Sequence, residues 1–169
     1  MRLFSWGRGV LGLACLMAWT AGAQAQVAWP ERPVRVVVPF PASGATDLVA
    51  RVVTQRVAAD LGQQMVVDNK PGAGGTIGTA EAAKAAPDGY TLLLTTSSTH
   101  AISPHLMPKL AYDPRKDFTP VAHVADAPSV VLVTNSLPVK TVPELIAYGK
   151  ANPGKLNYAT SGNGTIVHL

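Results

Sequence analysis

Four short segments rich in Ser, Thr and Gly contain the residues best suited to binding chemistry. They are PFPASGATD at 39–47, DNKPGAGGT at 68–76, TSSTHAIS at 96–103 and SGNGT at 161–165. Each follows an apolar run and precedes a helical pattern, so each is predicted to lead into a helix. The first amides of a helix lack intrahelical partners and lie at the positive end of its dipole. Hydroxyl groups and closely approaching backbone amides at such a place predict an anion site without a reactive charge.

The strength of single hydrogen bonds decides how many of these loops must act together. A hydrogen bond to a charged group contributes about 1.5–3 kcal/mol, whereas micromolar affinity requires about 8 kcal/mol. One Gly- and Ser-rich loop is commonly structural, because the turn itself needs these residues. Three such loops in the first half and one in the second favour a ligand with two carboxylates. The loops at 39–47 and 161–165 are then expected to face each other.

Other chemistries fit the sequence less well. The segment GAGGTIG at 72–78 lacks the third glycine and the later acid of a dinucleotide fingerprint. Neither a G-x-S-x-G elbow nor a histidine spacing typical of metal sites is present. We therefore expect no cofactor, no metal and no enzymatic activity, and we expect Asp47 to cap its helix rather than act as a base. An exported hydrolase that uses Ser97 or Ser161 with a histidine is the alternative from another class.

Alternating strand and helix patterns must position these loops. Strands are predicted at 34–38, 65–67 and 90–95, and helices at 46–61 and 77–85. Gly62 is expected to end the first helix, and Pro104 to limit any helix after the third strand to about one turn. Repeated strand–helix units predict an α/β fold whose parallel sheet collects the loops at its carboxyl edge. The face of the first helix expected to lie on the sheet is formed by Leu48, Val49, Val52, Val53 and Val57.

The second half begins with a change of pattern. Residues 121–126 are predicted to be a strand that crosses into a second domain, and an apolar run follows at 128–136. Thr141 and Glu144 form a capping box that starts a helix ending near Asn152. A further strand is predicted at 156–160, followed by the SGNGT loop and the first turn of a helix. Because the sequence stops there, we expect an incomplete chain.

The N-terminus has the three parts of a secretory signal. Arg2 and Arg8 lie before an apolar stretch. The small-residue site Ala23-Gln24-Ala25 follows that stretch. We expect residues 1–25 to be removed after Ala25 and the mature protein to be periplasmic. Cleavage as a lipoprotein at Cys15, the single cysteine, is the alternative. In either case no disulfide is expected.

The composition indicates a folded domain with little charge. Hydrophobic residues make up 47% of the 169 residues and charged residues 14%. The 14 Lys and Arg residues exceed the 10 Asp and Glu residues, but they are scattered rather than clustered. This pattern argues against nucleic acid as a partner.

Four ordered segments resemble a known family from Trp29 to the last residue. They are WPERPVRVVVPFPASGATDLVAR, DNKPGAGGTIGTAEAAKAAPDGYTLL, YDPRKDFTPVAHVA and LNYATSGNGTIVHL. They are similar to the Bug-type extracytoplasmic solute receptors of tripartite tricarboxylate transporters. The resemblance implies a monomeric periplasmic binding protein of type II, about twice this long, with two lobes of mostly parallel sheet flanked by helices. Lobe 1 would occupy 26–122, and 123–169 would begin lobe 2.

The resemblance also implies a function and a set of residues. Such receptors close on a small di- or tricarboxylate and deliver it to membrane permease subunits; a sensor for a signalling partner is the alternative. The first loop and the loop after the third strand would hold one carboxylate, partly through water, and the SGNGT loop the far end. The corresponding residues are Pro41, Ser43, Gly44, Thr46, Ser97, Ser98, Ser161, Asn163, Gly164 and Thr165. His100 joins them as a residue inside a site loop.

Two departures from the family pattern concern the ligand. Ser43 stands where the family usually has glycine, which restricts the backbone and adds a hydroxyl group. Ile166 and Val167 follow SGNGT, where small polar residues are usual. Both departures affect which ligand is bound rather than how it is bound.

Overall fold

The computed structural model describes residues 29–169, and Arg32–Leu169 form one structural unit. The predicted signal segment 1–25, its cleavage site and Cys15 lie outside the described residues.

A parallel sheet of three strands forms the centre of this unit. Strands β1 (Val34–Val38), β2 (Met65–Asn69) and β3 (Thr91–Leu93) are arranged in the order β2-β1-β3. Val36 lies opposite Val67 on one side and Leu92 on the other. The VRVVV sequence suits the central position, since a parallel strand covered on both faces needs apolar residues throughout. All three predicted strands are confirmed, although β2 is longer and β3 shorter than expected, and the three following loops share one edge.

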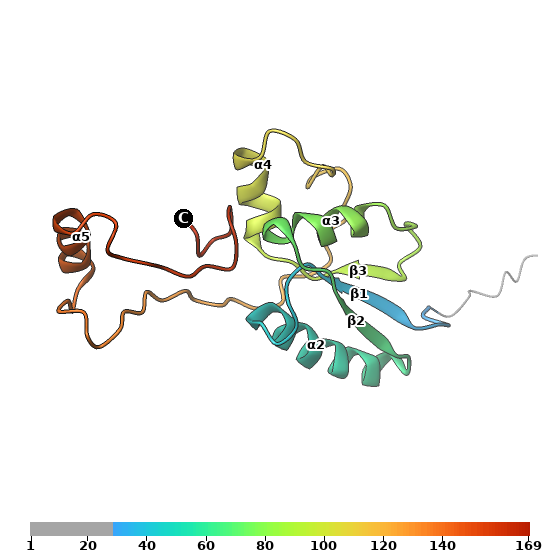
Figure 1. The fold of residues 1–169 in the computed structure, drawn as a ribbon. Helices are drawn as coiled ribbons and strands as arrows, with labels where there is room; N and C mark the ends of the chain where they lie inside the picture. Colours follow the sequence, from blue (N-terminus) through green and yellow to red (C-terminus); the bar gives the residue numbers. More distant parts are fainter. Residues whose placement is uncertain (1–28) are drawn as a thin grey trace, which may run out of the picture. The chain divides into compact units, whose positions relative to one another are not determined.

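Helices flank the sheet and follow the loops. Figure 1 shows α2 (Ala45–Leu61) and α3 (Thr76–Ala83) on opposite sides of the strands. A short 3-10 turn, η2 (Ala73–Gly75), leads into α3. The end of α2 is as predicted: Gly62 is left-handed, with φ +65°, and its N–H donates to the carbonyl of Ala58.

The buried face of α2 differs from the prediction. Leu48 and Val52 are 57% and 70% exposed, whereas Asp47, Ala50 and Thr54 are buried. Residues 47, 50 and 54 lie on one face at helical spacing, and their small or short side chains let the helix approach the sheet closely. Ala50 packs with Val38 and Phe40 in the core cluster, so backbone proximity rather than side-chain bulk selects the face.

The helix after β3 is longer than predicted. A π-helical segment, η3 (Ser98–Ile102), continues directly into α4 (Ser103–Leu106). Pro104 lies in the first turn of α4, where a missing N–H is tolerated. The proline therefore marks a change of helix type and does not end the helix.

The predicted strands of the second half are wrong for this structure. The strands predicted at 121–126 and 156–160 are not formed, and the apolar run at 128–136 is also in no strand, with Val130, Val131 and Leu132 71–86% exposed. A strand requires a hydrogen-bonded neighbour, and no described strand lies beside these segments. The helix expected after SGNGT is present only as turns.

Helix α5 (Val142–Ala151) confirms the capping box. The Glu144 N–H donates to Thr141 Oγ1, and the Thr141 N–H donates to Glu144 Oε2 at 3.2 Å. The helix ends at Asn152 as predicted, but none of its residues is buried. The local cap therefore stabilises α5, and burial of its side chains does not.

Candidate functional site

The loop between β1 and α2 presents the first amides of a long helix. Gly44 is the N-cap and has no side chain to bond them, so the amides of Ala45 and Thr46 stay available to a ligand. Ser43 precedes it with φ +66°, in the left-handed region. Pro41 and Ser43 are exposed, while Gly44 and Thr46 are half-buried.

The buried carboxylate of Asp47 fixes the shape of this loop. Its Oδ2 accepts hydrogen bonds from the Ser43 N–H at 2.8 Å and from Arg51 Nε at 2.9 Å. Its Oδ1 accepts from Asn69 Nδ2 at 3.0 Å, and the same amide group donates to the Phe40 carbonyl. Hydrogen bonds from Arg51 and Ser43 lower the pKa of Asp47 to about 2. Asp47 is therefore a charged support for the loop and a poor base, but the predicted capping role is wrong, because the N-cap of α2 is Gly44 and no side chain caps the helix.

The loop after β3 divides into exposed and buried hydroxyl groups. Ser97 is exposed, whereas Ser98 and Thr99 are buried. The Tyr112 hydroxyl donates to the Thr99 carbonyl at 2.7 Å and so holds this helix start in place. Ser98 Oγ accepts a hydrogen bond from the Ile166 N–H at 3.1 Å.

His100 lies in an aromatic environment. Its ring is 5.0 Å from that of Phe118, centroid to centroid, and its Nδ1 is 2.9 Å from Thr99 Oγ1. Burial lowers the pKa of His100. The neutral form is therefore favoured near pH 7, so His100 can offer a hydrogen bond to a ligand but not a full positive charge.

The SGNGT segment is folded on itself. Ser161 Oγ donates to Thr165 Oγ1 at 3.1 Å, and Thr165 Oγ1 donates to the Gly162 carbonyl at 2.7 Å. Gly164 and Thr165 are buried, whereas Ser161 and Asn163 are exposed. The segment thus exposes Ser161 and Asn163 on a turn that is closed by its own hydrogen bonds.

This turn rests on elements from the first half of the chain. Its following residue, Ile166, is bonded to Ser98, and Gly162 lies against the backbone of Gly74. The structure therefore brings together the loop after β3, the GAGG turn and SGNGT. The loop at 39–47 is fixed by Asp47 and Asn69, and its Phe40 ring lies against the same glycine turn at Gly75.

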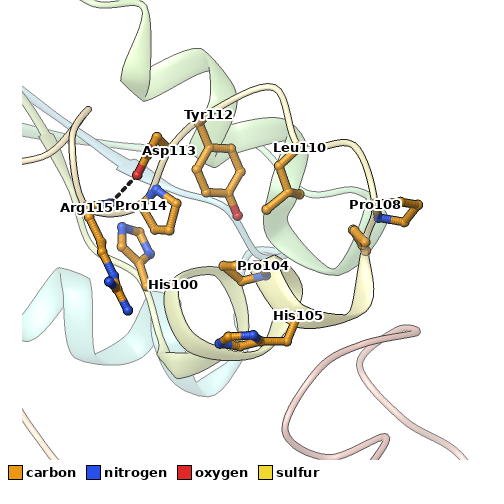
Figure 2. A pocket seen from close by; sticks show the side chains of 10 residues that line it. His100, Pro104, His105, Pro108, Leu110, Tyr112, Asp113, Pro114 and Arg115 are labelled. Carbon is orange, nitrogen blue, oxygen red and sulfur yellow. Dashed lines mark hydrogen bonds between the residues drawn. The ribbon is translucent and has the colours of Figure 1, made fainter.

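A pocket of about 430 Å³ lies beside the helix after β3. Figure 2 shows it between that helix and the segment from Met107 to Arg115. Of the predicted site residues only His100 lines it. The dashed contact joins the Arg115 N–H to Asp113 Oδ1 at 2.9 Å, within the wall of the pocket.

Among the residues that the structure describes, no serine hydroxyl is hydrogen-bonded to a histidine ring. Ser161 donates to Thr165, and the hydroxyl beside His100 belongs to the buried Thr99. Within residues 29–169 no three His, Cys, Asp or Glu side chains gather as a metal site would require. In the same range, no helix combines the length and apolar character needed to cross a bilayer.

Sequence reasoning missed the residues that hold the loops in place. Asn69 and Tyr112 are distant in sequence from the loops they bond, and no spacing rule connects them. Gly74 was visible only as part of a glycine-rich turn. Lys70 Nζ, just after β2, lies 3.6 Å from Asp68 Oδ2 and 3.9 Å from Glu81 Oε1.

Comparison with known proteins places this arrangement among transport receptors. The family described as "Tripartite tricarboxylate transporter family receptor" matches residues 49–169. A UPF0065 protein of Bordetella pertussis is 41% identical over 170 residues, covering 100% of this chain and 51% of that protein. The protein BugT of the same organism is 41% identical, covering 95% of this chain and 49% of BugT. The chain thus spans about half the length of these curated relatives.

Solved structures agree with the sequence comparison. A periplasmic transporter is 49% identical, with a TM-score of 0.79 over 83% of this chain and 47% of that one. MatC from Rhodopseudomonas palustris, solved with bound malate, is 43% identical, with a TM-score of 0.77 over 82% and 47%. An R. palustris protein solved with adipate is 41% identical, with a TM-score of 0.76 over 81% and 46%. The predicted α/β fold of the periplasmic binding protein class is thereby confirmed.

Proposed function

The chain belongs to the tripartite tricarboxylate transporter receptor family, and on that premise we propose that it binds a small di- or tricarboxylate in the periplasm and presents it to membrane permease subunits. Relatives solved with malate and adipate support this class of ligand. The observation that carries the proposal is the set of uncharged donor loops at one edge of a parallel sheet.

The local electrostatics support an anion at the start of α2. Two amides without intrahelical partners lie at the start of α2, in the same turn as Thr46, and the helix dipole favours negative charge there. Asp47 would oppose an anion if its charge were unbalanced. Arg51, at 2.9 Å from its carboxylate, compensates this charge. The loop therefore retains a favourable potential although it contains an acid.

The binding mode follows the two-lobe arrangement of the family. Residues 26–122 form the first lobe and 123–169 begin the second, with closure about residues 121–126. Pro41, Ser43, Gly44 and Thr46 contact one carboxylate, together with Ser97, Ser98 and His100. Ser161, Asn163, Gly164 and Thr165 contact the far end. The protein binds its ligand as a monomer, needs no metal or cofactor, and does not transform the ligand.

Calorimetric titration tests the proposal directly. The ligand-free chain is titrated with malate, adipate and citrate, and in parallel with the diamide of malate, which keeps the shape but lacks the charges. We expect micromolar binding of at least one acid and no binding of the diamide. Absence of heat from every acid, or equal binding of the diamide, would contradict the proposal.

A substitution at the first loop separates site binding from general effects. Thr46→Val replaces the hydroxyl donor with a methyl group and keeps the shape of the side chain. It should weaken binding of the acid about tenfold. Thr119→Val makes the same change at an exposed position outside the site and should leave the affinity unchanged.

A further inference from the structure

We propose that residues 161–166 form a reversible latch, whose seat is Gly74 and Ser98, and that this latch controls how long an anion is retained. The inference deepens the proposed function and rests on it, because it concerns release from the same site. Ser98 and four of the latch residues are also among the proposed ligand contacts, and the inference concerns the contact that these two protein segments make with each other.

The backbone at Gly74 lies unusually close to the latch. A Cβ atom placed on Gly74 would lie 2.8 Å from the Asn163 carbonyl oxygen, closer than real Cβ atoms approach an oxygen. It would also lie 3.5 Å from the Thr165 methyl group, which is fully buried. Only glycine therefore permits the observed approach. Because the neighbour is a backbone atom, a flexible side chain cannot move away to make room.

Ser98 supplies the directional part of the seat. Its hydroxyl is 2% exposed and accepts the Ile166 N–H at 3.1 Å, across 68 residues of sequence. Without that acceptor, the amide would lose its partner at a part-buried contact, which is unfavourable. Gly74 thus provides clearance for the latch and Ser98 provides its hydrogen bond.

The surroundings of the latch allow it to open. None of the residues of α5 is buried, and residues 121–136 are exposed and in no strand. Besides the seat, residues 161–166 meet the side chains of Leu106 and Met107 at Gly164. A contact of this kind, between a packed body and a loosely held segment, can open without disturbing the sheet.

A matched pair of glycines isolates the close approach from backbone strain. Gly74 has φ +65° and ψ +20°, and Gly62 has φ +65° and ψ +19°. A Cβ atom on Gly62 meets nothing within 4 Å. Gly74→Ala and Gly62→Ala therefore introduce the same left-handed alanine, but only the first obstructs the latch.

A second pair addresses the hydrogen bond. Ser98→Ala removes the acceptor of the Ile166 amide. Ser103→Ala removes another buried hydroxyl of the same helical segment, whose Oγ has no hydrogen-bond partner among the described residues. Only the first substitution should release Ile166.

Hydrogen exchange of the Ile166 amide, measured by NMR on the ligand-free chain, is the first readout. We expect exchange about tenfold faster in Gly74→Ala and Ser98→Ala, and unchanged in Gly62→Ala and Ser103→Ala. The amides of β1 serve as an internal reference and should keep their protection in all four variants. Equal effects of the two glycine variants, or loss of protection in β1 together with Ile166, would overturn the proposal.

Ligand release is the second readout. For malate or adipate, Gly74→Ala should raise the dissociation rate while leaving the association rate within about twofold, because a latch acts after entry. If Gly74→Ala lowers the fraction of active protein but leaves the dissociation rate unchanged, the latch does not control how long the anion is retained. If the unaltered chain binds neither acid, the proposed function fails, whereas Ile166 exchange still decides whether the latch exists.

Discussion

Single residues explain why the first loop has its shape. Ser43 takes a left-handed backbone conformation that suits glycine, and its N–H is held by the Asp47 carboxylate. The resemblance identified Ser43 as a departure from the family pattern. The structure adds that the departure places a side chain at φ +66°. The hydrogen bond to Asp47 therefore stabilises the left-handed backbone at residue 43, whereas the serine side chain destabilises it.

Replacement of Ser43 by glycine should stabilise the protein. Left-handed conformation costs a non-glycine residue about 1–2 kcal/mol, whereas the extra freedom of glycine in the unfolded chain costs about 0.5–1 kcal/mol. We expect Ser43→Gly to raise the free energy of unfolding by up to about 1 kcal/mol, measured by urea denaturation. Ser97→Gly, at φ −54°, has no strain to relieve and should lower it. Stabilisation by both variants would contradict this account.

Asp47 should make stability fall in acid. Its folded pKa, about 2, lies below the ordinary value of 3.8, so the unfolded state binds more protons between these values. The contribution of Asp47 is therefore complete above about pH 4 and disappears as the pH falls toward 2. Urea midpoints measured from pH 2 to 6 should decline less steeply for Asp47→Asn than for the unaltered chain. Asp60→Asn, in an exposed pair with Arg56, should reproduce the unaltered profile.

At the scale of elements, the orientation of α2 is the main result. Leu48 and Val52 are exposed to solvent, the other valines of the predicted face are only half-buried, and Ala50 is fully buried against the core. The helical period by itself allows either of two overlapping faces of α2 to be buried: the predicted face with Leu48 and Val52, or the observed face with Ala50. The sheet selects the face with small side chains, since this allows closer packing.

Substitutions on the two faces of α2 should differ sharply. Ala50→Leu inserts three carbon atoms into a closed contact and should cost about 1–3 kcal/mol of unfolding free energy. Val52→Ala, at a position 70% exposed, should change it by less than about 0.5 kcal/mol. Thermal unfolding followed by circular dichroism measures both. The reverse order of effects would restore the face predicted from the sequence.

At the scale of the whole molecule, similar sequences have different structures in its two halves. VRVVV at 34–38 is a buried central strand, while SVVLV at 129–133 is exposed and unpaired. Composition does not distinguish the two segments. The difference lies in the neighbours: β1 has a parallel partner on each side, whereas the later segment has none among the described residues.

Limited proteolysis should detect this difference. Elastase cleaves after small apolar residues, which occur in both segments. We expect the first cuts between residues 121 and 133, where the backbone lacks strand partners, and none in 34–38 until the core unfolds. Mass spectrometry of the fragments identifies the sites. Early cleavage within β1, or lasting resistance of 121–133, would contradict the structure.

Local rules were sufficient where the physical cause is local. Residues within a few positions of one another determine three features. These are the order of strands and helices in the first half, the helix ends at Gly62 and Asn152, and the capping box at Thr141. The family resemblance was likewise contained in short ordered segments. For the same reason, the predicted ligand residues lie in loops that the sequence alone could identify as donor-rich.

Tertiary contacts decided what local rules left open. Residues remote in sequence determine the other features. These are the buried face of α2, the absence of strands in 121–136, and the contacts of Asn69, Tyr112 and Gly74. A strand forms only beside a partner, and a loop keeps its shape only if distant groups bond it. The sequence alone therefore predicted which loops are rich in hydrogen-bond donors. Only the folded chain determined which of those donors are held together and which backbone positions leave room for their approach.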